Sequence, residues 1–150
     1  MMEFKRHINR RLHEDHLATL ALWGKLEVSL ATGKPDPALM RSAATALAGE
    51  IERHFAFEEA QLFPRLAAGG EGDMVGLLAE EHVVIRTAAT SFIALVKADP
   101  ADPKVRPLAL ELAERLASHV EKEEMSMLPA LEDLLDASAD EELTSQYVMT

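Results

Sequence analysis

The sequence contains no cysteine among its 150 residues. This absence excludes disulfide bonds, thiolate nucleophiles and thiolate metal ligands, so any metal must be bound through nitrogen and oxygen atoms. The sequence also lacks an apolar run near the roughly 20 residues that a membrane-spanning helix needs, and its N-terminus carries charge where a signal peptide would be apolar. We therefore expect a soluble, cytoplasmic protein without a membrane partner.

Positive charge is also scarce. The chain has 15 basic against 26 acidic residues and a formal net charge of -11 at pH 7. The basic residues are scattered, apart from a short stretch around Lys5, Arg6, Arg10 and Arg11. Because a nucleic-acid groove needs concentrated positive charge, we expect no nucleic-acid partner.

Glycine and proline, at seven residues each, gather mainly in the stretches 33–37, 69–73 and 99–103. The segments between them are long, rich in good helix formers such as Ala, Leu, Glu, Arg and Met, and free of the period-2 alternation of strands. The sequence thus predicts an all-α fold with helices over about 3–31, 37–67, 73–97 and 103–136. Since the connections are short, we expect an antiparallel up-down four-helix bundle.

Local signals place the ends of these helices. Asp36-Pro37 and Asp102-Pro103 each put a good N-cap residue before a proline suited to the first helical position. Gly33 and Gly69 fall where a left-handed C-terminal cap is expected.

Two prolines and an acidic tail modify this pattern. Pro64 and Pro129 lie within helical segments whose apolar stripe continues beyond them, so we expect each to kink its helix rather than end it. We therefore expect the chain to have two parts, a metal-binding bundle over residues 1–136 and an acidic C-terminal tail over 137–150. The stretch 136–142 is expected to fray.

The sequence repeats itself. A shift of 65 residues aligns the stretch from His54 to Leu66 with 119–131, so that His, Glu, Glu, Pro and Leu coincide; a shift of 66 aligns 12–16 with 78–82. The chain therefore reads as two similar helical hairpins. Each contributes one histidine from its first helix and a His-x-x-x-Glu from its second.

These repeated polar residues interrupt the apolar stripes of the helices. A His and a Glu four apart lie on one helical face, a spacing that is common at surfaces. Here, however, the pair replaces core residues, as in the stripe Leu47, Ile51, His54, Glu58, Leu62. A buried carboxylate without a partner costs several kcal/mol, and no Lys or Arg shares these stripes nearby. A histidine hydrogen-bonded to a buried Glu would explain one helix, whereas six converging groups favour a metal site with the ligands His16, His54, Glu58, His82, His119 and Glu123.

Other polar residues are expected to play lesser parts. His7 should be solvated, and His13 should lie at the surface, with an extra ligand as the alternative. Glu59 and Glu124 point about 100° away from the candidate ligands on their helices, which favours a salt-bridged outer face. Tyr147 in the tail gives no functional signal.

The doubled pattern resembles the hemerythrin-like, or HHE cation-binding, family from about His16 to Leu131. The resemblance implies an antiparallel four-helix bundle with a non-haem di-iron centre, in which Glu58 and Glu123 bridge the metals and the histidines are terminal ligands. It implies two iron ions as the cofactor, with zinc or manganese as alternatives. Each ion would receive about four protein donors, which leaves room for a small ligand such as dioxygen or nitric oxide.

The chain departs from the oxygen-carrying members of that family. The carriers have a further histidine in the third helix, where this chain has Leu78 and Arg86 around His82. They also place the last carboxylate at the position of Glu124, whereas the internal repeat favours Glu123. Both differences argue against simple oxygen transport.

Three functions are compatible with this pattern. The first is a protein that binds or senses dioxygen or nitric oxide without turnover, and we favour it because no additional buried acid, base or substrate pocket is evident in the sequence. The second is a di-iron enzyme that acts on nitric oxide or peroxide, or that donates iron for the repair of iron centres. The third is a structural or metal-storage bundle.

Overall fold

The computed structural model of the protein describes residues 3–33 and 35–149, and within these ranges it contains helices and no strand, as the all-α prediction requires. The first helix is α1 (His7–Ala31). A second rod joins α2 (Pro37–Glu50), two π-helical turns, η1 (Ile51–Phe55) and η2 (Glu58–Leu62), and α3 (Phe63–Ala68). Then follow α4 (Gly72–Ala98), a rod of α5 (Val105–Lys122), η3 (Glu123–Met127) and α6 (Leu128–Leu134), and finally α7 (Ala137–Met149).

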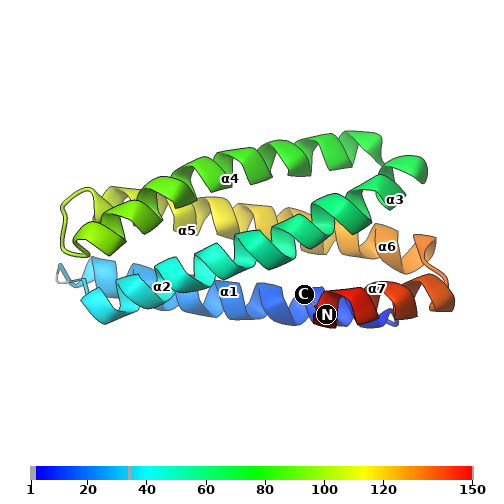
Figure 1. Ribbon diagram of the computed structural model, residues 1–150, viewed down its shortest axis with the longest axis horizontal. Coiled ribbons are helices and arrows are strands. Elements are labelled where there is room, and N and C mark those ends of the chain that lie inside the picture. Colours follow the sequence, from blue (N-terminus) through cyan, green and yellow to red (C-terminus); the bar gives the residue numbers. More distant parts are fainter. Residues whose placement is uncertain (1–2, 34, 150) are drawn as a thin grey trace.

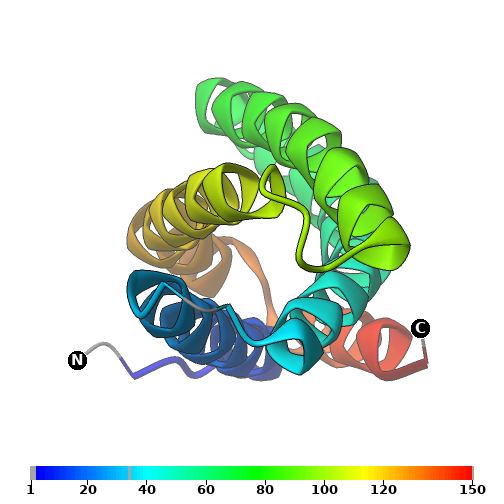
Figure 2. The same cartoon turned by 90° about the vertical axis from the view of Figure 1, so that its left-hand side faces the viewer.

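The long rods form a helical bundle. In Figure 1, α1, the α2–α3 rod, α4 and the α5–α6 rod lie lengthwise beside one another. The view along the long axis in Figure 2 shows them around a common interior. Contacts join α4 to α5, α1 to α5, α2 to α4 and α1 to α2, while α7 packs against α1. In the described part of the chain, every helix is too short or too polar to cross a membrane.

One predicted helix start is confirmed and one is displaced. At α2, the carboxylate of Asp36 accepts a hydrogen bond from the backbone N–H of Ala38 at 2.9 Å, as expected of an N-cap residue. The start predicted at residue 103 is wrong by two residues, since α5 begins at Val105. The carboxylate of Asp102 accepts from the N–H of Lys104 at 2.9 Å, which holds these residues in a turn before the helix.

Of the two predictions for glycine caps, one is confirmed and one is wrong. Gly33 has a φ of 80°, so the left-handed conformation predicted there is confirmed. Gly69 was expected to be left-handed but has a φ of -85°, and the left-handed residue is Gly70 with a φ of 95°. Glycine at residue 69 instead allows close packing, because a Cβ there would lie 2.9 Å from a methyl carbon of Leu134. A side chain at residue 69 would therefore displace the end of the exposed Leu134 side chain.

Pro64 and Pro129 do not end their helices, as predicted, because α3 and α6 continue past them. A proline lacks an N–H and its ring crowds the carbonyl one turn earlier, so an α-helix must deform before it. Both prolines follow a wide π-helical turn, η2 or η3, which supplies that deformation. The 65-residue repeat thus relates the two wide turns as well as the two prolines.

The prediction that residues 136–142 fray is wrong, because α7 is a helix that packs on α1. Its side chains Leu143 and Tyr147 are buried. The buried carboxylate of Asp140 accepts hydrogen bonds from the backbone N–H groups of His7 and Ile8, both at 2.9 Å. The N-terminal turn of α1 is therefore capped by a residue of α7.

The apolar core has two parts. One cluster, here the Trp23 cluster, includes Leu26, Leu47, Phe92 and Leu112. The other, here the Phe4 cluster, includes Leu12, Leu62, Leu78, Met127 and Leu143. Each of the four long rods contributes residues to both clusters, and the candidate ligands lie along the rods between those residues. The six residues therefore form a polar layer between two apolar clusters.

Candidate metal centre

All six predicted ligands are brought together in the interior. They come from all four rods, with His16 in α1, His54 in η1, Glu58 in η2, His82 in α4, His119 in α5 and Glu123 in η3. None of the six residues is more than 2% exposed. Two carboxylates and four imidazoles thus share a buried layer that water does not reach.

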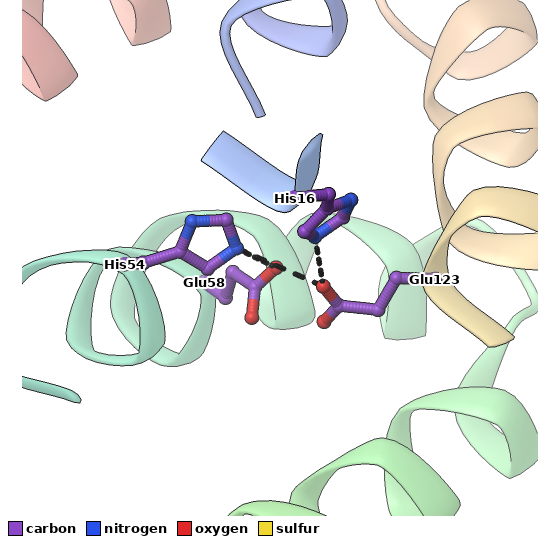
Figure 3. Close-up of side chains that lie close together, drawn as sticks. All are labelled: His16, His54, Glu58 and Glu123. Atoms are coloured by element: carbon purple, nitrogen blue, oxygen red, sulfur yellow. Dashed lines mark hydrogen bonds and ion pairs between the residues drawn. The ribbon is translucent and has the colours of Figure 1, made fainter. Parts of the chain in front are cut away.

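The six residues form two overlapping groups. Group A consists of His16 and His54 with Glu58 and Glu123, and group B consists of His82 and His119 with the same two glutamates. Within each group, one nitrogen or oxygen atom from every residue lies within 4.8 Å of the others. Figure 3 shows His16 and His54 of group A turned toward the two shared carboxylates.

Each carboxylate oxygen lies closest to a different imidazole, and Glu123 also lies 3.7 Å from the Nε2 of His54 and 3.9 Å from that of His82. The Oε2 of Glu58 is 3.1 Å from the Nε2 of His54, and its Oε1 is 3.2 Å from the Nε2 of His82. The Oε1 of Glu123 is 2.8 Å from the Nε2 of His16, and its Oε2 is 3.2 Å from the Nε2 of His119. Both carboxylates therefore reach from a histidine of group A to a histidine of group B.

The other ring nitrogen of three histidines meets a carboxylate at the edge of the layer. The Nδ1 atoms of His16, His82 and His119 lie 2.8, 2.7 and 2.7 Å from a carboxylate oxygen. The partners, in the same order, are Glu124, Glu59 and Glu81. Because an ionised carboxylate only accepts hydrogen bonds, these contacts place a proton on Nδ1 and leave Nε2 as an acceptor.

His54 has a more elaborate partner set. Its Nδ1 lies 3.2 Å from the hydroxyl oxygen of Tyr147, 3.5 Å from a carboxylate oxygen of Asp15 and 3.6 Å from one of Glu50. The Tyr147 hydroxyl donates to Asp15, so the hydroxyl, the imidazole and that carboxylate form one contacting cluster. His54 therefore also holds its Nδ1 proton toward the edge of the layer.

This arrangement directs acceptor atoms at one another. With Nδ1 protonated, four Nε2 lone pairs and four carboxylate oxygens face the same small space, and the Nε2 atoms of His82 and His119 are only 3.1 Å apart. Two of the buried oxygens, Glu58 Oε1 and Glu123 Oε2, make no hydrogen bond to any described residue. Lone pairs at such distances repel unless positive charge lies between them. The residues therefore fit a bound metal cation.

Without metal, protons must supply that charge. Burial alone would lower the pKa of His16, but Glu123 and Glu124 outweigh it and raise the pKa to about 9. Burial is likewise outweighed at His119, mainly by Glu123, and its pKa also rises to about 9. The pKa of His54 is raised too, while the imidazoles around Glu123 hold the pKa of that buried carboxyl well below its usual range. The layer thus attracts positive charge in either state.

The sequence predictions for the neighbouring residues are only partly right. His7 is exposed, as expected, and His13 is partly exposed and pairs with Glu124. Glu59 forms the expected salt bridge with Arg86, but both Glu59 and Glu124 also contact a histidine ring of the layer. The description of these two acids as an outer face was therefore incomplete.

The internal repeat contained the signal that would have found the outer acids. The shift of 66 aligns Asp15 with Glu81, and the shift of 65 aligns Glu59 with Glu124. The contacts follow the same relation, because Asp15 pairs with the Nδ1 of His54 as Glu81 pairs with the Nδ1 of the corresponding His119. Each acid belongs to a different helix from the histidine it contacts, which spacing along one helix cannot reveal.

An all-helical protein with buried histidines and glutamates at the centre of its bundle fits a metal-binding role. The model of the hemerythrin HHE cation binding domain matches this chain over residues 7–131, and the chain belongs to that family. Comparison with curated proteins and with solved structures yields no match.

Proposed function

We propose that this protein holds a pair of iron ions in the buried layer and uses them to bind or sense a small ligand such as dioxygen or nitric oxide. His16 and His54 would hold one ion and His82 and His119 the other, while Glu58 and Glu123 would bridge them. The scaffold in this proposal is an up-down four-helix bundle, to which α7 is added as a fifth helix.

The observation that carries the proposal is the pairing of each carboxylate oxygen with one imidazole Nε2. Glu58 reaches His54 on one side and His82 on the other, and Glu123 does the same between His16 and His119. A carboxylate that merely satisfied a core histidine would need only one such partner. Two carboxylates that each join the same two groups favour a centre for two cations.

The donor set favours iron. It combines imidazole nitrogens with carboxylate oxygens and contains no sulfur, which suits iron, zinc or manganese. Helical bundles that hold their metals between facing Glu and His side chains are typical of di-iron carboxylate proteins. Bound iron would supply redox chemistry and an open coordination position for a small ligand.

The remaining buried polar residues favour binding over turnover. In the described part of the chain, the buried side chains with polar groups outside the six include Asn9, Asp140 and Tyr147. Asn9 donates to the carbonyl of Leu128, and Asp140 caps α1, so both have structural roles. The hydroxyl of Tyr147 is engaged with Asp15 and His54 at the edge of the layer, which favours a role in holding His54 over proton donation to a substrate.

The test begins with stoichiometry. Protein loaded anaerobically with Fe²⁺ and desalted should retain two iron ions per chain. Azide added to the oxidised protein and nitric oxide added to the reduced protein should each change the visible spectrum. Return of the starting spectrum after nitric oxide is removed is the result expected of a binding or sensing protein.

Three outcomes would contradict the proposal. Retention of one iron ion or fewer would exclude the two-ion centre. Formation of nitrous oxide together with oxidation of the iron would replace the binding function with an enzymatic one. If neither azide nor nitric oxide changes the spectrum, small-ligand binding is wrong and a storage or structural role takes its place.

A further inference from the structure

We propose that the two metal positions are unequal, and that group A binds its ion more tightly than group B because Arg86 and Lys122 pair directly with the outer carboxylates of group B. The inference rests on the proposed two-ion function. It assigns group A to a resident ion and group B to an ion that exchanges more readily.

The outer carboxylates of group B are each neutralised by a cationic side chain. Arg86 binds Glu59 through two hydrogen bonds of 2.5 and 2.8 Å, and Glu59 in turn meets His82. Lys122 pairs with Glu81, which meets His119. Both histidines of group B therefore face a carboxylate whose negative charge is shared with a cation.

The outer carboxylates of group A have no such partner. Glu124 pairs with the imidazole of His13, and Asp15 accepts from the Tyr147 hydroxyl. Glu50 adds a third carboxylate, 3.6 Å from the ring of His54. Among residues 3–33 and 35–149, no lysine or arginine forms an ion pair with any of these three acids. Arg53 acts on Asp15 only through space.

The internal repeat shows where the two halves diverge. The shift of 66 places Leu20 at the position that corresponds to Arg86, and the shift of 65 places Phe57 at the position that corresponds to Lys122. The six ligands and four of the outer acids follow the repeat, whereas the two cations do not. The difference in charge between group A and group B therefore comes from these two pairs of positions.

Two physical effects of these cations act in the same direction. A cation near the site repels a divalent metal ion directly. It also draws negative charge from the outer carboxylate and makes the attached imidazole a weaker donor, and such outer partners change metal affinity by roughly 10- to 100-fold. Group A keeps its negative charge, so its ion should bind more tightly by about that factor.

Cavities lie beside the outer carboxylates of both groups. Glu81 and Lys122 line one of about 560 Å³ between α4 and α5. On the side of group A, Asp15 and Glu50 line a cavity of about 200 Å³, and Glu50 also lines one of about 540 Å³. Because solvent reaches the outer partners of both groups, the inequality rests on the cations and not on access.

The first experiment locates the first ion in the native chain. Zn²⁺ is added to the metal-free protein while the ring nitrogens of the histidines are followed by long-range ¹H–¹⁵N NMR. At one equivalent, the signals of His16 and His54 should shift in most of the protein, while those of His82 and His119 should shift in only a minor fraction. A shift of all four together, or of the group B pair first, would overturn the inference.

The second experiment exchanges the residues that break the repeat. Calorimetric Zn²⁺ titration of the native chain should show two steps whose dissociation constants differ by about 10-fold or more. The variant Arg86→Leu should tighten the second step, and Leu20→Arg, at a partly exposed position, should weaken the first. Arg41→Leu is the control, because Arg41 is an exposed cation of α2 that lines none of the cavities described above.

The outcomes separate this inference from the function on which it rests. Binding of fewer than two Zn²⁺ ions by the native chain would contradict both the two-ion function and the inequality of the two positions. Two ions bound in equal steps would leave the two-ion centre and overturn the inequality. An unchanged gap between the steps in both variants, with helical content confirmed by circular dichroism, would show that these charges are not its cause.

Discussion

At the scale of single residues, Asp15 and Glu81 occupy corresponding positions in the two halves of the sequence and differ by one methylene group. Glu81 reaches the ring of His119 directly at 2.7 Å, whereas Asp15 remains 3.5 Å from the ring of His54. The hydroxyl of Tyr147 contacts both Asp15 and His54 and so adds a second partner for that ring. A shorter acid in one half is thus compensated by a tyrosine from α7, which lies outside the part of the chain that matches the family model.

The two shared glutamates should be distinguishable from their neighbours by metal content. Glu58→Ala or Glu123→Ala removes a carboxylate that faces both groups, so we expect at most one iron ion to remain after desalting. Glu59→Ala or Glu124→Ala removes only a partner of a histidine ring. These variants should still bind two ions under excess metal, with affinity lowered roughly 10- to 100-fold. Metal analysis and chelator competition provide the measurement.

The fourth rod supplies the decisive comparison, because Glu123 and Glu124 are adjacent in sequence. Glu123 is 1% exposed and lies within 4 Å of the Nε2 atoms of all four histidines, whereas the Glu124 side chain is 24% exposed and also pairs with His13. Loss of an ion in Glu124→Ala, with two ions kept in Glu123→Ala, would reverse the assignment of these residues.

The residues of the layer were predictable to different degrees for a physical reason. A ligand that replaces a leucine on an apolar stripe is visible in the sequence, because burial of an acid there needs an explanation. Glu59 and Glu124 lie off that stripe, and their histidine partners belong to other helices. Such a pairing depends on how the rods are placed against one another, and spacing along a single helix carries no record of it.

At the scale of elements, both shared glutamates begin a π-helical turn, Glu58 in η2 and Glu123 in η3. Wide turns of this kind are rare and often occur at functional sites. The helical stripe predicted that these residues face the core, but its average period cannot separate an α-helical turn from a wide one. The prolines that follow six residues after each glutamate were the local signal for the deformation.

The contact of α7 with α1 should be measurable through Asp140. Asp140→Ala leaves the backbone N–H groups of His7 and Ile8 without their acceptor, so the free energy of unfolding should fall by about 1–2 kcal/mol. Amide exchange in the first turn of α1 should accelerate in the same variant. Urea unfolding and hydrogen exchange provide these two measurements.

Glu141→Ala is the matched control, since it removes a neighbouring acid whose side chain is exposed. Equal stability of the Asp140 and Glu141 variants would mean that the cap does not form in solution. The acidic run 140–142 reads as a solvated tail in the sequence, because nothing local distinguishes the one acid that meets a distant helix end.

At the scale of the whole molecule, the polar layer is placed where it affects every rod. It lies between the Trp23 cluster and the Phe4 cluster and takes ligands from all four rods. The sequence predicted this layer because apolar stripes and their interruptions are local and repeated. It did not predict α7, whose burial depends on long-range contacts of Leu143 and Tyr147.

Protons bound by the imidazoles of the layer stabilise the folded metal-free protein. The stability of that protein should therefore fall as the pH rises and these protons are lost. His16 and His119 have an ordinary pKa of 6.5 and a pKa of about 9 in the folded chain. Groups whose pKa is raised by folding contribute their full stability below the lower value and lose it as the pH passes the higher one. The midpoint of thermal unfolding of the metal-free protein should therefore decrease between about pH 6.5 and 9.

The stabilising effect of bound metal should grow over the same interval. Bound metal replaces the protons on the Nε2 atoms and requires unprotonated imidazole, so its affinity and its stabilising effect increase as the pH rises. The difference in unfolding temperature between loaded and metal-free protein should thus be small near pH 6 and large near pH 9. His7→Gln, which changes an exposed histidine outside the layer, should keep both profiles. A difference that stays constant with pH would mean that the four inward imidazoles do not exchange protons for metal, and the layer would then have to be stabilised by hydrogen bonds alone.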